Sequence, residues 1–263
     1  MKNISFLHAA PRSGNTILSS LLNQNPKINV SAHSLVTDIM LASIVGKDST
    51  MFQNFPDHQS YDNVMSSIFN SYYKDWPGDF IIDRSLVGYQ SRFDLVRKYL
   101  NEDFKCVVII RDLFDIFASY LKWADKEPTS YLNEGPVSVK EKIEAIMHKD
   151  GLVSQFLLGT TNLYNHHHDN TIFVHYDELV KFPQHIINRI YKFLNIDFFK
   201  HDFENIKQFE VNGIKYDDKI YGKNMHTIRS SLKKEDSEKY RSLIPGEIYH
   251  QYREINNWLL NIR

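Results

Sequence analysis

The chain has 263 residues, of which 42% are hydrophobic and 24% charged; these values are typical of globular proteins and exclude extensive disorder. Its 31 Lys and Arg residues against 32 Asp and Glu leave a formal net charge of −1. No nucleic acid is therefore expected as a partner, because general binding to phosphate backbones needs a basic excess. Cys106 is the single cysteine, which excludes an intrachain disulfide and a cysteine-cluster zinc site.

Four short apolar segments, several rich in β-branched residues, predict buried strands at Ile4–His8, Phe80–Asp83, Lys105–Ile110 and Thr171–His175. Helical patterns alternate with them at Asn15–Asn23, Val36–Val45, Gln59–Tyr73, Arg92–Leu100, Leu113–Trp123, Val139–Tyr164 and Pro183–Leu194. The more polar tail contains two predicted closing helices, Glu235–Arg241 and Glu247–Leu260. This alternation predicts an α/β fold, a three-layer sandwich with a central parallel sheet.

The chain shows no repeat, low-complexity tract or linker, so one domain over residues 1–263 is expected. No targeting segment and no integral membrane segment are expected, since no apolar stretch approaches the ~20 residues of a spanning helix. These features predict a soluble protein in a reducing, cytoplasmic compartment, with Cys106 as a buried, inert thiol.

The loop after the first predicted strand reads Pro11-Arg12-Ser13-Gly14-Asn15-Thr16 and runs directly into a helix. Open parallel sheets bind ligands at the carboxyl ends of their strands. Backbone N–H groups, the helix N-terminus, the Thr16 hydroxyl and the Arg12 charge can converge there on an anion. The loop lacks the first Gly and the Lys of the nucleotide P-loop, GxxxxGK[ST], which disfavours ATP or GTP chemistry. A turn that only caps the helix is the alternative.

A second candidate anion site follows the third predicted strand. Arg111 ends this strand, and Ser119 lies eight residues further along, about two turns into the next helix. Taken singly, each residue has a simpler explanation, an ion-pair partner for Arg111 and an incidental hydroxyl for Ser119. Together they place a cation and a hydroxyl at the same edge of the sheet as the first loop.

These two motifs resemble sulfotransferases that use 3′-phosphoadenosine-5′-phosphosulfate (PAPS). PRSGNT followed by a helix and Asn25-Pro26 is similar to the 5′-phosphosulfate loop of the family, and the Arg111–Ser119 pair is similar to its 3′-phosphate motif. Phe80–Ser85 (FIIDRS) and Val174–Val180 (VHYDELV) resemble two further family segments. The pattern is nearest to the protein-tyrosine and carbohydrate branch. The resemblance implies a P-loop-NTPase-like sulfotransferase fold, with a PAPS-binding core over residues 1–195 and a closing segment over 196–263.

The resemblance also implies roles for individual residues. The 5′-phosphosulfate would be held by Arg12, Ser13, Gly14, Asn15 and Thr16. Arg111 and Ser119 would hold the 3′-phosphate, with Tyr176, Lys223 and Arg229 as further nucleotide contacts. Tyr176 is equally explained as a residue that closes the sheet, and Lys223 and Arg229 as parts of a solvated loop. Arg12 and Arg84 would neutralise the sulfuryl group during transfer. Asn15, Arg84 and Leu113 depart from the commoner Ser or Thr, Lys and Pro of the family.

His33 stands where the protein-tyrosine branch has its carboxylate base, and its ordinary pKa near 6.5 suits proton transfer near neutrality. A loop histidine without a role is the alternative, and Asp83 is the second candidate for the base. The run His166-His167-His168 is predicted to be solvated rather than a metal site, because helical ligands need i, i+3 or i+4 spacing. No metal is expected.

The predicted function is therefore transfer of a sulfuryl group from PAPS to an acceptor hydroxyl, or less favourably an amine, with release of 3′-phosphoadenosine 5′-phosphate (PAP). The acceptor can be a small molecule, glycan, lipid or peptide. A P-loop-like nucleotide kinase or NTPase and a non-catalytic nucleotide-binding module are the alternatives.

Overall fold

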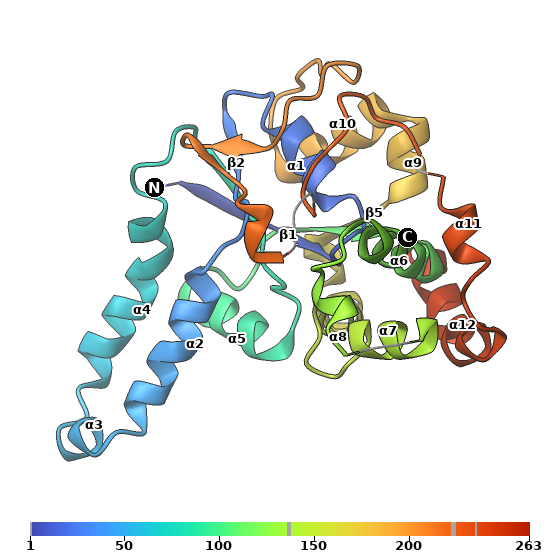
Figure 1. Ribbon diagram of the computed structural model, residues 1–263. Helices are drawn as coiled ribbons and strands as arrows, with labels where there is room; N and C mark the ends of the chain where they lie inside the picture. The colour runs from blue at the N-terminus through green and yellow to red at the C-terminus, as the bar shows by residue number, and fades with distance from the viewer. Residues whose placement is uncertain (1, 136–137, 222–224, 235) are drawn as a thin grey trace.

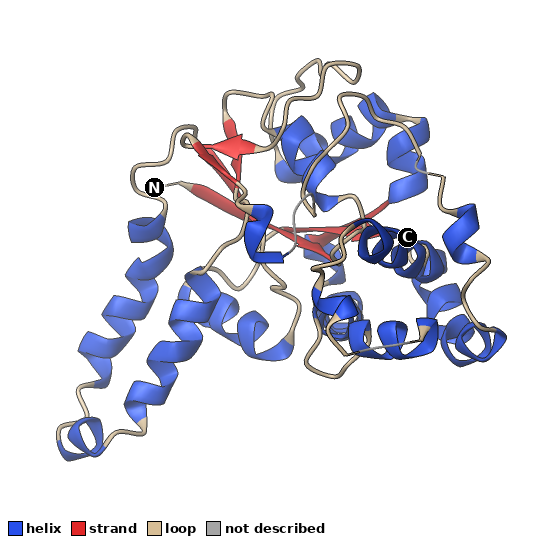
Figure 2. Ribbon diagram, in the orientation of Figure 1, coloured by secondary structure: helices blue, strands red, loops and turns tan. Residues whose placement is uncertain are grey.

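The computed structural model describes residues 2–135, 138–221, 225–234 and 236–263. At its centre lies a five-stranded parallel sheet with the strand order β2-β3-β1-β4-β5 (Figures 1 and 2). The strands are β1 Asn3–Ala9, β2 Ile28–Val30, β3 Phe80–Asp83, β4 Cys106–Ile110 and β5 Thr171–His175. Four of these were predicted. The edge strand β2 was missed because three residues with a central asparagine are too short to show a pattern.

Alternate side chains of the central strands enter two separate hydrophobic cores. In the β1–β4 register Phe6 lies opposite Cys106 and Leu7 opposite Val107. Phe6 and Cys106 belong to the core on one face of the sheet, and Leu7 and Val107 to the core on the other. Both faces are therefore covered, as parallel sheets require.

Helices cover both faces of the sheet (Figures 1 and 2). One layer contains α1 Asn15–Leu22, α9 Tyr176–Lys181 and α10 Pro183–Leu194. The other contains α2 Val36–Lys47, α4 His58–Tyr72, α5 Gln90–Tyr99, α6 Leu113–Lys126, α7 Val139–Ile146, α8 Leu152–His166, α11 Glu238–Arg241 and α12 Gly246–Asn261. The short helix α3 Thr50–Asn54 joins α2 to α4. The predicted three-layer α/β sandwich is confirmed.

Three local predictions were wrong. The helix expected over Val139–Tyr164 is divided into α7 and α8, because the chain turns at Met147–Gly151 and places Gly151 against backbone oxygens of Ile146 and His148. Helices α3 and α9 were not predicted, and each is too short to show a full amphipathic period.

The histidine run is the third correction. His166 and His168 are exposed, but His167 is buried, with its Nε2 2.6 Å from the carbonyl oxygen of Phe104. Burial lowers the pKa of His167, which favours the neutral ring. The expectation that the whole run is solvated is therefore wrong for His167. Cys106 is buried within β4, and burial raises the pKa of its thiol, as expected for an inert cysteine.

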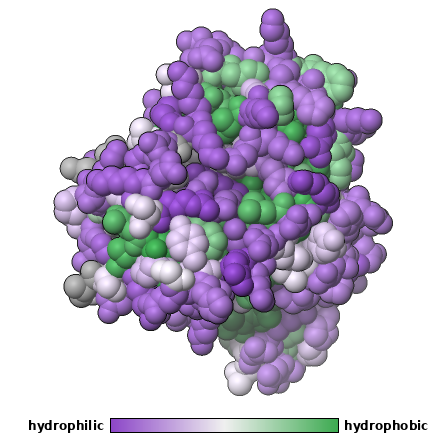
Figure 3. All heavy atoms as spheres, turned by 90° about the vertical axis from the view of Figure 1, so that its right-hand side faces the viewer, coloured by the Kyte–Doolittle hydropathy of each residue, from purple (hydrophilic) through white to green (hydrophobic). Residues whose placement is uncertain are grey.

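The tail after Asn195 packs back onto the core. A hairpin forms from β6 Glu210–Val211 and β7 Ile214–Lys215, and the 3-10 turn η3 Asp218–Tyr221 follows it. Arg241 of α11 pairs with Asp112 and Asp115 at the start of α6. The face that carries α11 and α12 is predominantly hydrophilic, with hydrophobic side chains in separate patches (Figure 3). Among the described residues, no helix is both long and apolar enough to cross a bilayer.

Candidate active site

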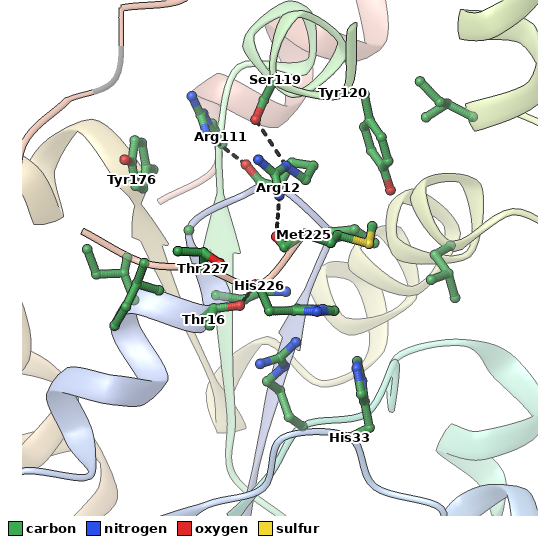
Figure 4. Close-up of a pocket in the computed structure, with 18 of the residues that line it drawn as sticks. Arg12, Thr16, His33, Arg111, Ser119, Tyr120, Tyr176, Met225, His226 and Thr227 are labelled. Atoms are coloured by element: carbon green, nitrogen blue, oxygen red, sulfur yellow. Dashed lines mark hydrogen bonds between the residues drawn. The ribbon is translucent and has the colours of Figure 1, made fainter. Parts of the chain in front are cut away.

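A cavity of about 510 Å³ opens beside the loops that follow the carboxyl ends of the strands (Figure 4). The predicted site residues that line it are Arg12, Gly14, Asn15, Thr16, His33, Arg84, Arg111, Ser119, Tyr176 and Arg229. Ser13 does not line it, and Lys223 lies outside the described residues. The topology thus brings together residues from the segments that follow β1, β2, β3, β4 and β5, and from the tail.

The loop after β1 approaches Tyr176 without an intervening side chain. Gly14, the N-cap of α1, has φ 96°, a left-handed conformation that glycine adopts without strain. A Cβ atom there would fall 2.5 Å from the Tyr176 ring. Because no side chain caps α1, the N–H groups of its first turn are left for an anion at the cavity.

The polar side chains of this loop mainly hold its backbone in place. The Ser13 hydroxyl, which is fully buried, donates to the Ala10 carbonyl at 2.7 Å, and Asn15 Nδ2 donates to the same oxygen at 3.2 Å. The Thr16 hydroxyl donates to Asn15 Oδ1 at 3.2 Å. Ser13 and Asn15 therefore shape the anion-binding backbone, which explains why the Asn15 departure from the family pattern is compatible with the fold.

Arg12 connects this loop with two other parts of the cavity. Its φ of 67° is left-handed, a strained conformation for a non-glycine residue. Arg12 Nε donates to Ser119 Oγ at 3.1 Å, and an Nη atom donates to the carbonyl of Met225 at 2.6 Å (Figure 4). The loop after β1 is thereby tied to helix α6 and to the tail.

Arg111 is the most deeply buried cation of the site. Only 6% of its surface is exposed, and its guanidinium carbon lies 4.5 Å from the centre of the Tyr176 ring. One Nη atom donates to the carbonyl of Arg12 at 2.6 Å. Its Nε and other Nη are buried without a hydrogen-bond partner among the described residues. Such unsatisfied charged donors are costly, so this arrangement indicates a site for an anion.

Arg84 extends from the end of β3 to the tail. Its guanidinium donates to the Tyr216 hydroxyl at 2.6 Å, and that hydroxyl donates to the carbonyl of Ala32 at 3.2 Å. The backbone N–H of Arg84 donates to Ser31 Oγ at 2.7 Å. Tyr216 was not singled out from the sequence, where one tyrosine in a polar tail carries no distinguishing pattern.

Two histidines lie at the same end of the cavity. The His33 side chain is exposed to it, and its ring centre lies 5.4 Å from that of His226 (Figure 4). Partial desolvation, the positive charge of Arg84 and the neighbouring His226 lower the pKa of His33 to about 4. His226 Nδ1 lies 2.6 Å from Asp218 Oδ1. Nothing in the sequence pointed to the contact between His226 and Asp218, because only Lys223 and Arg229 in this loop were expected at the site.

Asp83, the second candidate for the base, lies away from the cavity lining. It is fully buried, and its carboxylate accepts hydrogen bonds from the Tyr73 hydroxyl at 2.6 Å and from Ser34 Oγ at 2.5 Å. Burial raises its pKa. The structure thus buries Asp83 at the end of β3, where two hydroxyl donors occupy one of its oxygens.

Another part of the cavity lining is an apolar and aromatic wall. Its lining residues come from α6, from the 3-10 turn η1 Tyr131–Asn133, and from the α7–α8 connection; they are Tyr120, Tyr131, Ala145, Ile146, Gly151 and Leu152. Asp150 is the one carboxylate in this part of the described lining. The break between α7 and α8, absent from the sequence-based prediction, therefore forms part of the cavity wall.

The two candidate anion sites, after β1 and after β4, lie at the carboxyl edge of a parallel sheet, where open α/β folds bind their ligands. The family model of the sulfotransferase family matches residues 6–200. The chain belongs to the sulfotransferase family. The family and enzyme class predicted from the sequence motifs are confirmed. A comparison with curated proteins found no sequence match.

Solved structures show the same fold. Mouse sulfotransferase SULT7A1 complexed with PAP superposes with a TM-score of 0.60 at 14% identity, over 100% of this chain and 86% of that chain. The sulfotransferase domain of the Synechococcus PCC 7002 olefin synthase gives 0.57 at 15% identity, over 100% and 97%. Retinol dehydratase in complex with androsterone and inactive cofactor PAP gives 0.54 at 16% identity, over 100% and 83%. These similarities confirm the predicted sulfotransferase fold.

Proposed function

We propose that this protein transfers a sulfuryl group from PAPS to an acceptor hydroxyl and releases PAP. An amine is the less favoured acceptor. Arg111 carries the proposal, because two of its buried guanidinium nitrogens have no hydrogen-bond partner among the described residues. Ser119 lines the same cavity. A 3′-phosphate would satisfy these donors with charge-assisted hydrogen bonds. Support also comes from the family match and from the structural neighbours whose titles name PAP.

The loop after β1 fits the other end of the donor. The first-turn N–H groups of α1, the Thr16 hydroxyl and the side chain of Arg12 would hold the 5′-phosphosulfate, and Ser13 and Asn15 would keep the backbone in shape. Gly14 leaves room for the Tyr176 ring, which lines the cavity beside Arg111. Arg229, also at the lining, and Lys223 are proposed as further nucleotide contacts.

The donor supplies the electrophilic sulfuryl group, and the chain supplies charge and position. Arg12 and Arg84 would neutralise the charge that develops on the sulfuryl and bridging oxygens, and their planar guanidinium groups stay protonated throughout. The acceptor hydroxyl must give up a proton to a group at the cavity. His33, the base suggested by its motif position, lies at the lining and is proposed to contact the acceptor hydroxyl.

The apolar body of the acceptor would lie against the aromatic and aliphatic wall of the cavity. The wall formed by Tyr120, Tyr131, Ile146 and Leu152 favours a hydroxyl carried on an apolar or aromatic body, whether from a small molecule, lipid, glycan or peptide. Residues 196–263 would close over the donor as part of one domain, since the Met225 carbonyl accepts a hydrogen bond from Arg12. A reducing, cytoplasm-like compartment suits the single buried thiol.

The kinase or NTPase alternative is not favoured, because the loop after β1 lacks the P-loop Lys and the family match is to sulfotransferases. Isothermal titration calorimetry with PAP and with AMP tests the proposed function. PAP is expected to bind at least about tenfold more tightly, since a charge-assisted phosphate contact contributes on the order of 1.5–3 kcal/mol. Equal affinity would remove the 3′-phosphate assignment. A screen with labelled PAPS would then identify the acceptor, and a complete lack of transfer would favour a binding module.

A further inference from the structure

The imidazole of His226 is fixed on several sides within the tail. Its Nδ1 lies 2.6 Å from Asp218 Oδ1, while its backbone N–H donates to Asp218 Oδ2 at 2.9 Å. Its ring stacks on Tyr216, with the two centres 4.0 Å apart and the planes 3° from parallel. Tyr216 is in turn held by Arg84 and Ala32. Few rotations of the His226 ring are compatible with all these contacts.

This arrangement determines which nitrogen of His226 is basic. A carboxylate beside Nδ1 holds the proton on that nitrogen, which leaves the lone pair on Nε2. The same carboxylate stabilises the imidazolium that forms when Nε2 accepts a proton. The side chains of His226 and Asp218 are only 11% and 16% exposed, so their interaction is weakly screened.

Burial of the His226 ring favours its neutral form before the reaction. Desolvation lowers the pKa of His226, with further lowering by Arg84 and Arg12, while Asp218 opposes this shift. His33 and Tyr216 are the other titratable groups packed against the ring. His33 differs from His226 in its support, because among the described residues it makes ring contacts but no hydrogen bond.

We infer that His226, oriented by Asp218, is the general base that accepts the proton of the acceptor hydroxyl. The inference rests on the proposed function. The acceptor oxygen forms the new bond to sulfur, its proton moves to Nε2 of His226, and the bond from sulfur to the 5′-phosphate oxygen breaks, with its electron pair left on the phosphate. Asp218 is a positioning residue and stays ionised. His33 then contacts the acceptor without taking its proton.

Steady-state kinetics of His226→Gln and Asp218→Asn test the inference, with His185→Gln on the exposed face of α10 as the matched control. At saturating acceptor, kcat is expected to fall about 10²–10⁴-fold in His226→Gln, the range of general-base contributions. Asp218→Asn keeps the shape but favours the other tautomer, so at least about a tenfold fall is expected. KM for PAPS and the PAP affinity by calorimetry should stay within about twofold, and the control should match the parent chain.

Nitrogen-15 NMR of the histidine rings in the PAP complex gives a readout that does not depend on turnover. His226 is expected as the Nδ1–H tautomer, and Asp218→Asn should shift it toward Nε2–H. An unchanged kcat in His226→Gln, or an Nε2–H tautomer in the parent chain, would overturn the inference. Loss of PAP affinity in His226→Gln would make the residue a nucleotide contact instead. Failure of the parent chain to prefer PAP over AMP would refute the proposed function, a result separate from all of these.

Discussion

Tyr176 packs directly against Gly14, so that a Cβ atom on the glycine would lie 2.5 Å from two ring carbons. The ring also lies beneath the guanidinium of Arg111, at 4.5 Å. One aromatic side chain therefore contacts the N-cap of α1 and the cation that follows β4. The two proposed anion sites depend on the same ring for their positions.

Gly14→Ala is expected to destabilise the protein and to weaken PAP binding. The methyl group would clash with Tyr176, and alanine at a positive φ costs on the order of 1–3 kcal/mol. Urea unfolding followed by circular dichroism measures the first effect and calorimetry the second. Gly46→Ala in α2 is the control, since no atom lies within 4 Å of its added Cβ. That variant should be unchanged or more stable by up to about 1 kcal/mol.

Arg111→Ala is expected to abolish the preference for PAP over AMP. At the described cavity lining, Arg111 is the only buried arginine with unpaired guanidinium donors. AMP has no 3′-phosphate that could accept hydrogen bonds from these donors. PAP affinity should fall about 10–100-fold, while AMP affinity should change by less than about threefold. Calorimetry with both ligands measures this. An equal loss for PAP and AMP would show that Arg111 acts on the fold or on the 5′ end instead.

His33→Ala is expected to affect the acceptor more than the chemical step. Its ring lies at the cavity beside His226, but among the described residues no carboxylate is hydrogen-bonded to it, as Asp218 is to His226. KM for the acceptor should rise several-fold, and kcat should fall less than in His226→Gln. A kcat at saturating acceptor that falls more in His33→Ala than in His226→Gln would assign the proton transfer to His33.

Stability is expected to decrease in mild acid because of His8. This fully buried side chain lies between the Phe156 carbonyl, 3.0 Å from Nε2, and the Gly88 N–H, which donates to Nδ1 at 3.3 Å. Burial lowers the pKa of His8 to about 4. Between this value and the ordinary 6.5, the unfolded chain binds more protons than the folded one, so stability falls as pH decreases through that window.

The effect of His8 can be measured by urea unfolding at pH 7 and pH 5. The loss assigned to this one group is about 2 kcal/mol over that interval. His8→Gln should lose less stability between the two pH values than the parent chain does, whatever its stability at pH 7. An identical loss in both chains would assign the acid sensitivity to other buried histidines, such as His201.

Four of the five strands could be predicted from the sequence, and the loops after β1 and β4 could be singled out, because their signals are local. A strand such as Cys106–Ile110 is apolar on both faces, Arg111 directly follows it, and Ser119 lies eight residues further along, within α6. The base that we propose was harder to predict. His226 contacts Asp218 and stacks on Tyr216, and neither contact leaves a periodic pattern in the sequence. The α7–α8 break was missed because Gly151 is tolerated within an otherwise continuous helical pattern.

The hydrogen bond from Arg111 to the carbonyl of Arg12 has a consequence for selectivity. It fixes the separation between the two proposed anion sites, because β1 and β4 are neighbouring strands of a buried sheet. Ligands are then distinguished by the distance between their two anionic groups rather than by total charge. A nucleotide with the same number of phosphates in a single chain would satisfy one site and leave the other without a partner.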